Sequence, residues 1–348
     1  MLGTILHIGA CGPIMNPFVI FLKNNFDFQQ HEFLLTKTKD EPEFAGIKNV
    51  NLAERKPLAR IRHLFLSVFK MHQAKKVIIH GLFDPKLVVI LFFTPWLLKK
   101  CYWVMWGGDL YIYELGERDW RWSLREFFRR PVIRNMGYLV AYTKGEVSLA
   151  QKWYGCRGQH IRCFFYTSNL YSEYHIASNP SSCVKILAGN SADPSNNHLE
   201  IFENLEKFKD QDIKIYAPLT YGNSDYAKII IEQGVKKFGC KFIPLTEHMS
   251  FDQYVDFLAD IDIAIFSHNR QQAMGTIRTL IGLGKKVYMK QYLTSAISLK
   301  EDGVKVFDIK HITLTKNFLQ RDKNILRVKE LFSHDRLVRC LSHIWENK

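Results

Sequence analysis

The feature of this chain that most constrains its fold is a repeated alternation of short apolar segments with longer amphipathic ones. Short apolar segments fit buried strands, and the segments between them carry apolar residues at helical spacing. Strands that alternate with helices form parallel sheets covered on both faces, so the sequence predicts an α/β fold. The predicted strands are residues 4–8, 32–35, 76–80, 101–105, 137–142, 184–188, 213–217, 241–243, 261–266 and 286–289.

The length of 348 residues suits two such sheets in two domains. Residues 172–182 are rich in Ser, Asn and Pro and form the best linker candidate. We therefore predict one Rossmann-like domain over residues 1–175 and a second over residues 183–315. A helical segment over residues 316–348 follows, and it could cross back to the first domain.

The charge of the chain is basic and unevenly distributed. The formal net charge is +14, and the first 180 residues hold 24 Lys and Arg against 14 Asp and Glu. This excess favours an anionic partner, which could be a phospholipid surface, a pyrophosphate or a nucleic acid. The longest apolar stretch, residues 87–98, is too short to span a bilayer, so contact with a membrane would be peripheral. The seven cysteines lack metal-binding spacing, and we expect neither a metal nor a cofactor.

One segment of the basic half combines arginines with aromatic residues. At helical spacing, Trp120, Leu124, Phe127 and Phe128 fall near one stripe, and arginines fall beside it. This composition is typical of a helix that lies in a membrane interface, and the alternative is a core-packing helix with a solvated arginine face. The basic half favours the first interpretation. Membrane or acceptor contacts are accordingly expected for Trp120, Arg121, Trp122, Arg125 and Arg129.

Polar loops follow three predicted strands of the N-terminal half, at residues 80–85, 106–111 and 142–146. The carboxyl ends of strands line the ligand crevice in open α/β sheets, so these loops suggest one wall of a cleft. Individually, His80 could be a core-edge histidine and Asp109 a turn or N-cap residue. The first strand–loop–helix, residues 4–23, lacks the glycine and carboxylate pattern of a dinucleotide site, which favours a structural role.

The most distinctive loop of the C-terminal half is residues 189–198, between a predicted strand and a predicted helix. Ser195, Asn196 and Asn197 suit the N-cap position, and unbonded amides at a helix start favour an anion. The loop is therefore either a phosphate site or an ordinary strand–turn–helix connection. Asp260 and Asp262 match a metal-binding DxD pattern, but they join a helix end to a buried strand, and we interpret them as structural.

These loops resemble the bacterial 4-acetamido-4,6-dideoxygalactose (Fuc4NAc) transferases, which complete the lipid-linked repeat unit of enterobacterial common antigen. The resemblance covers most of residues 75–285. Gly108, Ala192 and Ala273 depart from the pattern of that family, and residues 9–18 do not match it, so the acceptor or sugar could differ. The matching residues are His80-Gly81 to Pro85, Trp106-Gly107, Asp109-Leu110-Tyr111, Gly189-Asn190-Ser191, Asp193, Ser195, Asn196, His198, Pro218, Tyr221, Phe251-Asp252, Tyr254, Arg270-Gln271-Gln272 and Gly275-Thr276.

The resemblance implies a GT-B glycosyltransferase with two Rossmann-like domains facing across a cleft. It implies transfer of a deoxyamino sugar from a nucleoside-diphosphate donor, dTDP-linked, to a polyprenyl-pyrophosphate-linked glycan on the cytoplasmic face of the inner membrane. Without a metal, amides, helix dipoles and fixed cations must stabilise the leaving diphosphate. Donor contacts are implied for Gly189, Asn190, Ser191, Asp193, His198, Pro218, Tyr221, Arg270, Gln271, Gln272, Gly275 and Thr276.

An inverting transfer needs a base that takes the proton of the acceptor hydroxyl. Asp109 is the first candidate for this base and His80 the second, with Asp193 or His198 as further options. Two other functions stay open at this point. A GT-B-type epimerase would act on a nucleotide sugar alone. A basic nucleic-acid-binding protein would explain the charge, but the chain has no recognised motif for it, so we expect no nucleic-acid partner.

Overall fold

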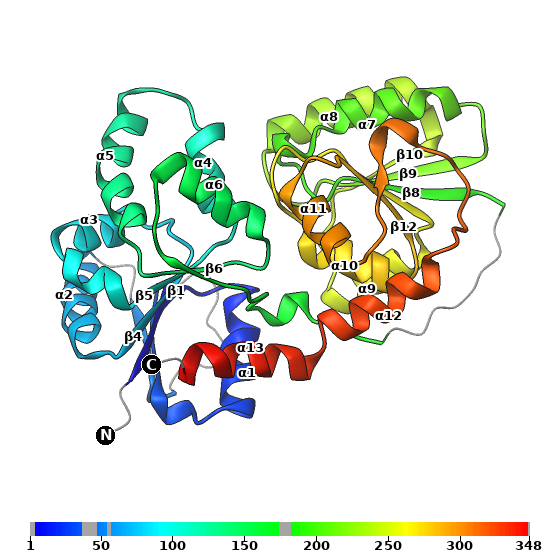
Figure 1. Ribbon diagram of the computed structural model, residues 1–348. Coiled ribbons are helices and arrows are strands. Elements are labelled where there is room, and N and C mark those ends of the chain that lie inside the picture. Colours follow the sequence, from blue (N-terminus) through cyan, green and yellow to red (C-terminus); the bar gives the residue numbers. More distant parts are fainter. Residues whose placement is uncertain (1–3, 37–46, 54–56, 174–181, 347–348) are drawn as a thin grey trace. The chain divides into compact units, whose positions relative to one another are not determined.

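The computed structural model describes residues 4–36, 47–53, 57–173 and 182–346. The chain forms two compact units (Figure 1). The N-terminal unit comprises Met1–Asn169 and Asp335–Lys348, and the C-terminal unit comprises Leu170–His334. Each unit is a parallel sheet flanked by helices, which confirms the predicted α/β fold. Most of the predicted linker, at residues 174–181, lies outside the described residues.

The sheet of the N-terminal unit has the strand order β3-β2-β1-β4-β5-β6-β7, and every neighbouring pair is parallel. The direction of strand addition reverses between β1 and β4, which makes that place the topological switch point. The strands are β1 (Ile5–Ala10), β2 (His31–Thr36), β3 (Val50–Ala53), β4 (Lys76–His80), β5 (Cys101–Val104), β6 (Tyr138–Val140) and β7 (Gln159–Ile161). The helices are α1 (Met15–Asn25), α2 (Pro57–Gln73), α3 (Pro85–Phe93), α4 (Gly108–Leu115), α5 (Trp120–Arg134) and α6 (Lys144–Tyr154), with α13 (His334–Glu346) from the end of the chain.

Both faces of this sheet are buried. On one face, Leu6 and Trp103 belong to a core shared with α3, α5 and α6. On the other face, His7 lies against Phe18 of α1 and Trp345 of α13, with ring centroids 6.0 and 5.6 Å away. Lys76 Nζ also donates to the carbonyls of Ile344 and Trp345, at 2.6 and 3.0 Å. A cation at the carboxyl end of a helix is favourable, so this contact fixes α13 onto the N-terminal unit.

The C-terminal unit repeats the architecture with the order β10-β9-β8-β11-β12-β13, again all parallel. Its switch point lies between β8 and β11. The strands are β8 (Val184–Ala188), β9 (Ile213–Pro218), β10 (Phe242–Leu245), β11 (Ile263–Phe266), β12 (Lys286–Met289) and β13 (Phe307–Asp308). The helices are α7 (His198–Leu205), α8 (Ser224–Phe238), α9 (Phe251–Asp260), α10 (Met274–Gly282), α11 (Thr294–Glu301) and α12 (Arg321–Leu331).

The strand predictions are accurate in the middle of each sheet and fail at three of the four described edges, the exception being β10, which was predicted at residues 241–243. The observed β4, β8 and β12 have the predicted bounds. The sequence analysis missed β3, β7 and β13, which are short edge strands with little apolar character. The predicted terminal helical region is broken, because α12 ends at Leu331 and α13 begins at His334. Among the described helices, none combines the length and apolar character that a bilayer crossing requires.

Candidate active site

Two loops meet at the switch point of the C-terminal unit. One follows β8 and the other follows β11, and these strands pair in parallel with Ile263 opposite Ile186. Both loops therefore leave the same edge of the sheet, where ligands bind in doubly wound folds. The amide of Asn269 donates to Ser195 O, and Asn197 Nδ2 donates to Ser267 O, both at 2.9 Å. The structure thus joins two segments that the sequence analysis selected separately.

The first loop turns sharply at Gly189, whose φ is +69°. A Cβ at this position would lie 2.6 Å from His198 Nε2 and 2.9 Å from Asn196 Oδ1, so only glycine fits. His198 is buried beneath the loop, with Nδ1 3.2 Å from Tyr226 Oη, and burial lowers its pKa to about 4. His198 therefore supports the loop as a neutral ring.

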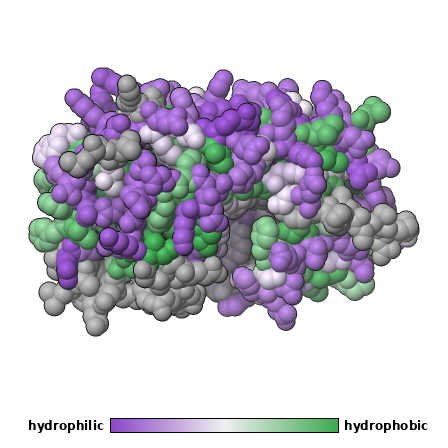
Figure 2. Space-filling view, turned by 90° about the horizontal axis from the view of Figure 1, so that it is seen from below, coloured by the Kyte–Doolittle hydropathy of each residue, from purple (hydrophilic) through white to green (hydrophobic). Residues whose placement is uncertain are grey.

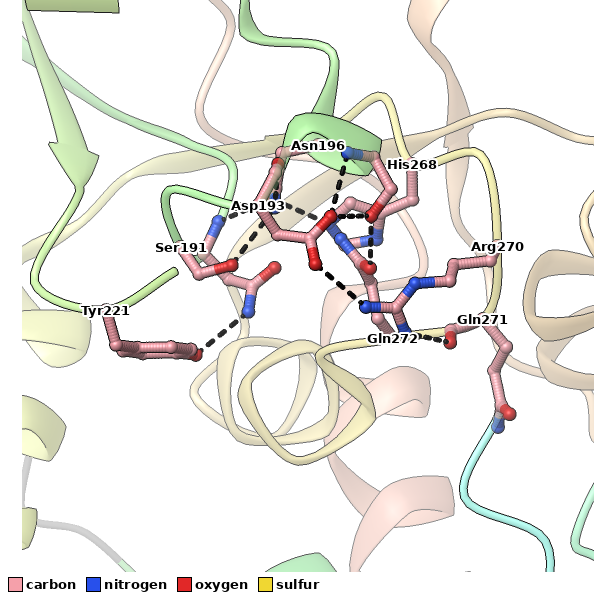
Figure 3. Close-up of polar contacts among 10 residues, drawn as sticks. Ser191, Asp193, Asn196, Tyr221, His268, Arg270, Gln271 and Gln272 are labelled. Carbon is pink, nitrogen blue, oxygen red and sulfur yellow. Dashed lines mark hydrogen bonds and ion pairs between the residues drawn. The ribbon is translucent and has the colours of Figure 1, made fainter. Parts of the chain in front are cut away.

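Asn196 fixes the shape of the loop. Its Oδ1 accepts hydrogen bonds from the Asn190 amide (2.9 Å) and His268 Nε2 (3.1 Å), and its Nδ2 donates to Ser191 Oγ at 3.1 Å (Figure 3). Burial and the charge of Arg270 lower the pKa of His268 to about 3, so the imidazole is neutral. The sequence analysis did not select His268 or Asn196 as site residues, although His268 directly follows a predicted strand.

One expectation about this loop is wrong, and a second is confirmed only in part. The amides of Gly189 and Asn190 are not free for a phosphate, because they donate to Ile265 O and Asn196 Oδ1. The N-cap position falls on Asn197, one of the three candidates, but its side chain makes no capping hydrogen bond. A 3₁₀ turn over Pro194–Asn196, capped by Asp193, comes first, and α7 begins at His198. The anion-binding capacity of the loop therefore lies mainly in side chains.

Asp193 and Arg270 form the charged centre of this site. Asp193 Oδ2 lies 3.3 Å from Arg270 Nη2, and Asp193 Oδ1 accepts from the Ser195 amide at 2.9 Å (Figure 3). Ser195 Oγ lies between Asp193 Oδ1 and Gln272 Oε1, at 2.5 and 2.8 Å. Burial acts to raise the pKa of Asp193, but the Ser195 hydrogen bonds and the Arg270 charge outweigh it and hold this pKa below its usual range.

Two buried polar atoms beside this centre have no hydrogen-bond partner among the described residues, Asn190 Oδ1 and Gln272 Nε2. Buried polar atoms are normally satisfied, so an open acceptor on Asn190 and an open donor on Gln272, one in each of the two joined loops, are available to hydrogen-bond a ligand. Asn190 Nδ2 donates to Tyr221 Oη at 3.1 Å, and the Tyr221 side chain is 63% exposed. An exposed ring next to open polar groups could stack on a planar ligand.

The other predicted donor residues lie around the same edge. Pro218 ends β9, and the loop after it is tied to the first loop by Ala192 N donating to Tyr221 O at 2.8 Å. Gly275 and Thr276 lie in the first turn of α10, where Thr276 Oγ1 is 3.3 Å from Tyr254 Oη. The DxD pattern is elsewhere: Asp260 pairs with Lys185, and Asp262 pairs with Lys316 at 2.9 Å.

In the N-terminal unit, His80 belongs to a buried chain of hydrogen bonds. His31 Nδ1 lies 2.9 Å from His7 Nε2, His7 Nδ1 lies 3.0 Å from His80 Nε2, and His80 Nδ1 lies 2.7 Å from Tyr166 Oη. Burial lowers the pKa of His80 to about 3 and that of His31 to about 4, and it also lowers that of His7. Both ring nitrogens of His80 are therefore engaged in hydrogen bonds, and the three histidines of this hydrogen-bond chain are neutral. No sequence pattern pointed to the partners of His80.

Asp109 is 1% exposed, and its carboxylate accepts three hydrogen bonds. The donors are Leu82 N (2.9 Å), Trp103 Nε1 (2.6 Å) and Trp106 N (3.0 Å). Burial raises the pKa of Asp109, against these hydrogen bonds and the nearby Arg129 charge. The carboxylate ties the loop after β4 to the loop after β5. Its role as a base stays a prediction, and this geometry favours a positioning role.

A small pocket of about 110 Å³ marks the switch point of the N-terminal unit. It is lined by the ends of β1, β2 and β4 and by residues of α2 and α3. Asp84 lies at this pocket, is exposed, and caps α3 by accepting from the Lys86 amide at 2.9 Å. An exposed carboxylate at a switch point is placed to contact a ligand.

The first half of α5 presents its apolar stripe outward. Trp120, Leu124 and Phe127 are 70, 53 and 62% exposed, whereas Glu126 and Arg129 are buried. These three side chains of the apolar stripe therefore face the surface and do not pack into the core. Arg129, expected among the surface arginines, instead donates through Nη1 to Leu82 O and through Nη2 to Asp109 O, both at 2.7 Å.

The two sheets give the chain the GT-B fold, the architecture of nucleotide-sugar glycosyltransferases. Anabaena HepE, solved with UDP and glucose, has a TM-score of 0.69 at 11% identity, covering 99% of this chain and 100% of that one. WaaG, a glycosyltransferase involved in lipopolysaccharide biosynthesis, has a TM-score of 0.58 at 11% identity, covering 99 and 95%. A Rickettsia africae glycosyltransferase has a TM-score of 0.61 at 13% identity, covering 99 and 100%. These similarities show the fold alone.

The family is shown by sequence. Residues 14–330 match the model of the family described as 4-alpha-L-fucosyltransferase, glycosyl transferase group 56. The chain belongs to this family and is a glycosyltransferase, which confirms the resemblance found in its loops.

Proposed function

We propose that the protein transfers a deoxyamino sugar from a dTDP-linked donor to a polyprenyl-pyrophosphate-linked glycan during synthesis of a bacterial surface polysaccharide. The observation that carries the donor half of this proposal is the open polar site around Arg270. Asn190 Oδ1 and Gln272 Nε2 have no partner there among the described residues. The guanidinium of Arg270 is held by two long contacts, Nη2 to Asp193 Oδ2 at 3.3 Å and Nη1 to the Gln271 carbonyl at 3.5 Å. The remaining N–H groups of Arg270 are suited to a diphosphate, which arginine binds in bidentate fashion.

The other donor contacts follow from this placement. Tyr221 would stack on the nucleobase, and Ser191 and Gln271 would bind the sugar or ribose. Gly275 and Thr276 at the start of α10 would face the diphosphate with the positive end of the helix dipole. These groups would stabilise the charge that develops on the leaving diphosphate, which is where electrostatic catalysis is most effective.

On the acceptor side, we propose Asp84 as the base, in place of the first choices Asp109 and His80. A base must reach the acceptor hydroxyl directly or through one water. The buried carboxylate of Asp109 already accepts three hydrogen bonds, and both ring nitrogens of His80 are hydrogen-bonded to other side chains. Asp84 is exposed at the switch-point pocket, and its carboxylate accepts only the capping bond among the hydrogen bonds described.

We further propose that the N-terminal unit lies on the cytoplasmic face of the inner membrane. Exposed aromatic side chains gather on α2, η2 (Pro95–Lys100), α3 and α5, namely Phe65, Phe69, Phe93, Trp96, Trp120 and Phe127. Hydrophobic residues of this unit reach the surface among hydrophilic ones (Figure 2). Apolar side chains with neighbouring arginines are the composition of an interfacial surface, and large exposed apolar patches mark interaction sites.

A thermal-shift panel of nucleoside diphosphates and their sugars tests the donor site. A ligand at about 100 times its dissociation constant stabilises a protein by about 2.7 kcal/mol, which such a panel detects. Arg270→Ala should abolish the shift by dTDP while leaving the smaller shift by thymidine unchanged. Lys228→Ala, an exposed lysine of α8, is the matched control. Equal loss of both shifts in Arg270→Ala would argue against a phosphate role for Arg270.

A further inference from the structure

We propose that a cavity between α3 and α5 binds the isoprenoid diphosphate end of the lipid-linked acceptor, with Arg125 on the diphosphate. This inference rests on the proposed function and names the site for its second substrate. The cavity measures about 360 Å³ and lies entirely within the N-terminal unit. That volume is within the range of small-molecule sites.

The walls of the cavity are almost wholly apolar. Val88 and Val89 of α3 face Leu124 and Phe128 of α5 across it, and Ile112 of α4 adds a further side. Such a lining suits a hydrocarbon chain, because burying it removes apolar surface from water. A free sugar or nucleotide would find few hydrogen-bonding partners there.

Arg125 gives the cavity a cationic end. Its Nε and Nη2 atoms are buried without a hydrogen-bond partner among the described residues. Withdrawing N–H groups of a guanidinium from water is costly unless acceptors complete them, so these two atoms of the half-buried Arg125 favour an anion at this point. Arg121 lines the same cavity and is exposed.

Arg129 and Asp109, the other buried charged groups of the lining, already have partners, although Arg129 Nε has only an ion pair with Glu126 Oε1 at 3.4 Å and no hydrogen bond among the described residues. Arg129 donates to two backbone carbonyls, and the carboxylate of Asp109 is taken up by its three donors. An anion at Arg125 would thus meet two arginines and no free carboxylate. A diphosphate matches both their charge and the forked geometry of their donors.

The position of the cavity agrees with the order of parts in a lipid-linked glycan. Phe83 lines both this cavity and the switch-point pocket that holds Asp84. Trp120 and Leu124 also line this cavity, and both are exposed on the surface proposed to face the membrane. In the proposed complex the glycan lies at the switch-point pocket and the diphosphate lies at Arg125. The hydrocarbon chain then passes Trp120 towards the surface proposed to face the membrane.

Farnesyl diphosphate tests the cavity directly, by calorimetry with the full chain. It should bind more tightly than either farnesol or inorganic pyrophosphate, because each of these lacks one half of the recognised structure. Arg125→Gln should weaken binding by about tenfold to a hundredfold, the range for a hydrogen bond to a charged group. Val89→Trp, which fills the apolar wall, should also abolish binding. Arg134→Gln removes the same charge from the same helix outside the cavity and should have no effect.

Several results would overturn the proposal. If Arg125→Gln and Arg134→Gln weaken the binding of farnesyl diphosphate equally, the effect is one of net charge and not of a site at Arg125. If farnesol binds as tightly as farnesyl diphosphate, the cavity has no site for the diphosphate. Displacement of farnesyl diphosphate by dihexanoyl phosphatidylglycerol at the same concentration would identify a general lipid site instead. The thermal shift by dTDP is read in the same variants. Its absence in the unmodified protein would refute the proposed donor, and it should be unchanged in Arg125→Gln.

Discussion

Replacing His31 by glutamine should reduce the dependence of the stability of the N-terminal unit on pH. Burial lowers the pKa of His31 to about 4, against 6.5 for the unperturbed side chain. Between these values the unfolded chain binds a proton that the folded unit does not. The stabilisation is therefore complete above pH 6.5 and is lost as the pH falls towards 4.

The size of the effect follows from the two pKa values. At pH 5 the linkage amounts to about 2 kcal/mol for His31, and a similar value holds for His80, whose pKa is lowered to about 3. Glutamine can still hydrogen-bond His7 Nε2, which His31 approaches to 2.9 Å, but it does not titrate. The loss of unfolding free energy between pH 7.5 and pH 5 should thus be about 2 kcal/mol smaller in His31→Gln.

Urea unfolding followed by tryptophan fluorescence measures this unit selectively, since all seven tryptophans lie in it. Asp109, whose pKa is raised by burial, contributes with the opposite sign, but it is common to both proteins and cancels in the comparison. His343→Gln changes an exposed histidine of α13 and serves as the control. The same pH dependence in His31→Gln and the unmodified protein would refute a neutral, buried histidine chain.

Three further predictions concern the loops. Gly189→Ala should destabilise the C-terminal unit and abolish nucleotide binding, because a Cβ would meet His198 and the positive φ adds about 1 kcal/mol of strain. Gly155→Ala, at φ +66° and ψ 30° with open space around it, introduces the left-handed strain without a clash. An equal loss of thermal stability in both variants would exclude the clash with His198. Asp84→Asn keeps a good N-cap and should lower kcat at least a hundredfold without changing stability. Full activity of Asp84→Asn would show that Asp84 is not the base. Asp109→Asn should lower the free energy of unfolding by about 1–3 kcal/mol, because an amide cannot accept all three hydrogen bonds.

The sequence was sufficient to predict the positions of the loops that form the proposed donor site. Apolar runs such as β8 and β11 stop where the strand leaves the core, so polar residues after them must lie at the edge of the sheet. The edge strands β3, β7 and β13 were missed because one side of an edge strand is not enclosed, so its residues need not be apolar. Residue 189 must be glycine because a Cβ there would clash with His198. This contact exists only in the folded loop, so the sequence does not show it.

Side-chain placement was beyond the reach of sequence patterns. The histidine chain joins residues 7, 31 and 80 through the register of three parallel strands, and no local spacing encodes that register. Similarly, an amphipathic stripe has the same period whether it faces the core or the solvent, so the outward orientation of α5 needed the structure.

The sequence by itself determined the fold class, the family and the loops that carry polar residues, because these depend on local periodicity and short motifs. Tertiary structure decided which of those residues are open to a ligand. Buried hydrogen bonds occupy the Asp109 carboxylate and both His80 nitrogens, whereas Asp84 and Arg270 remain accessible. Arg125 Nε and Nη2 have no hydrogen-bond partner among the described residues, and this side chain lines an apolar cavity. Accessibility depends on what packs against a side chain from distant segments, and only the folded chain brings those segments together.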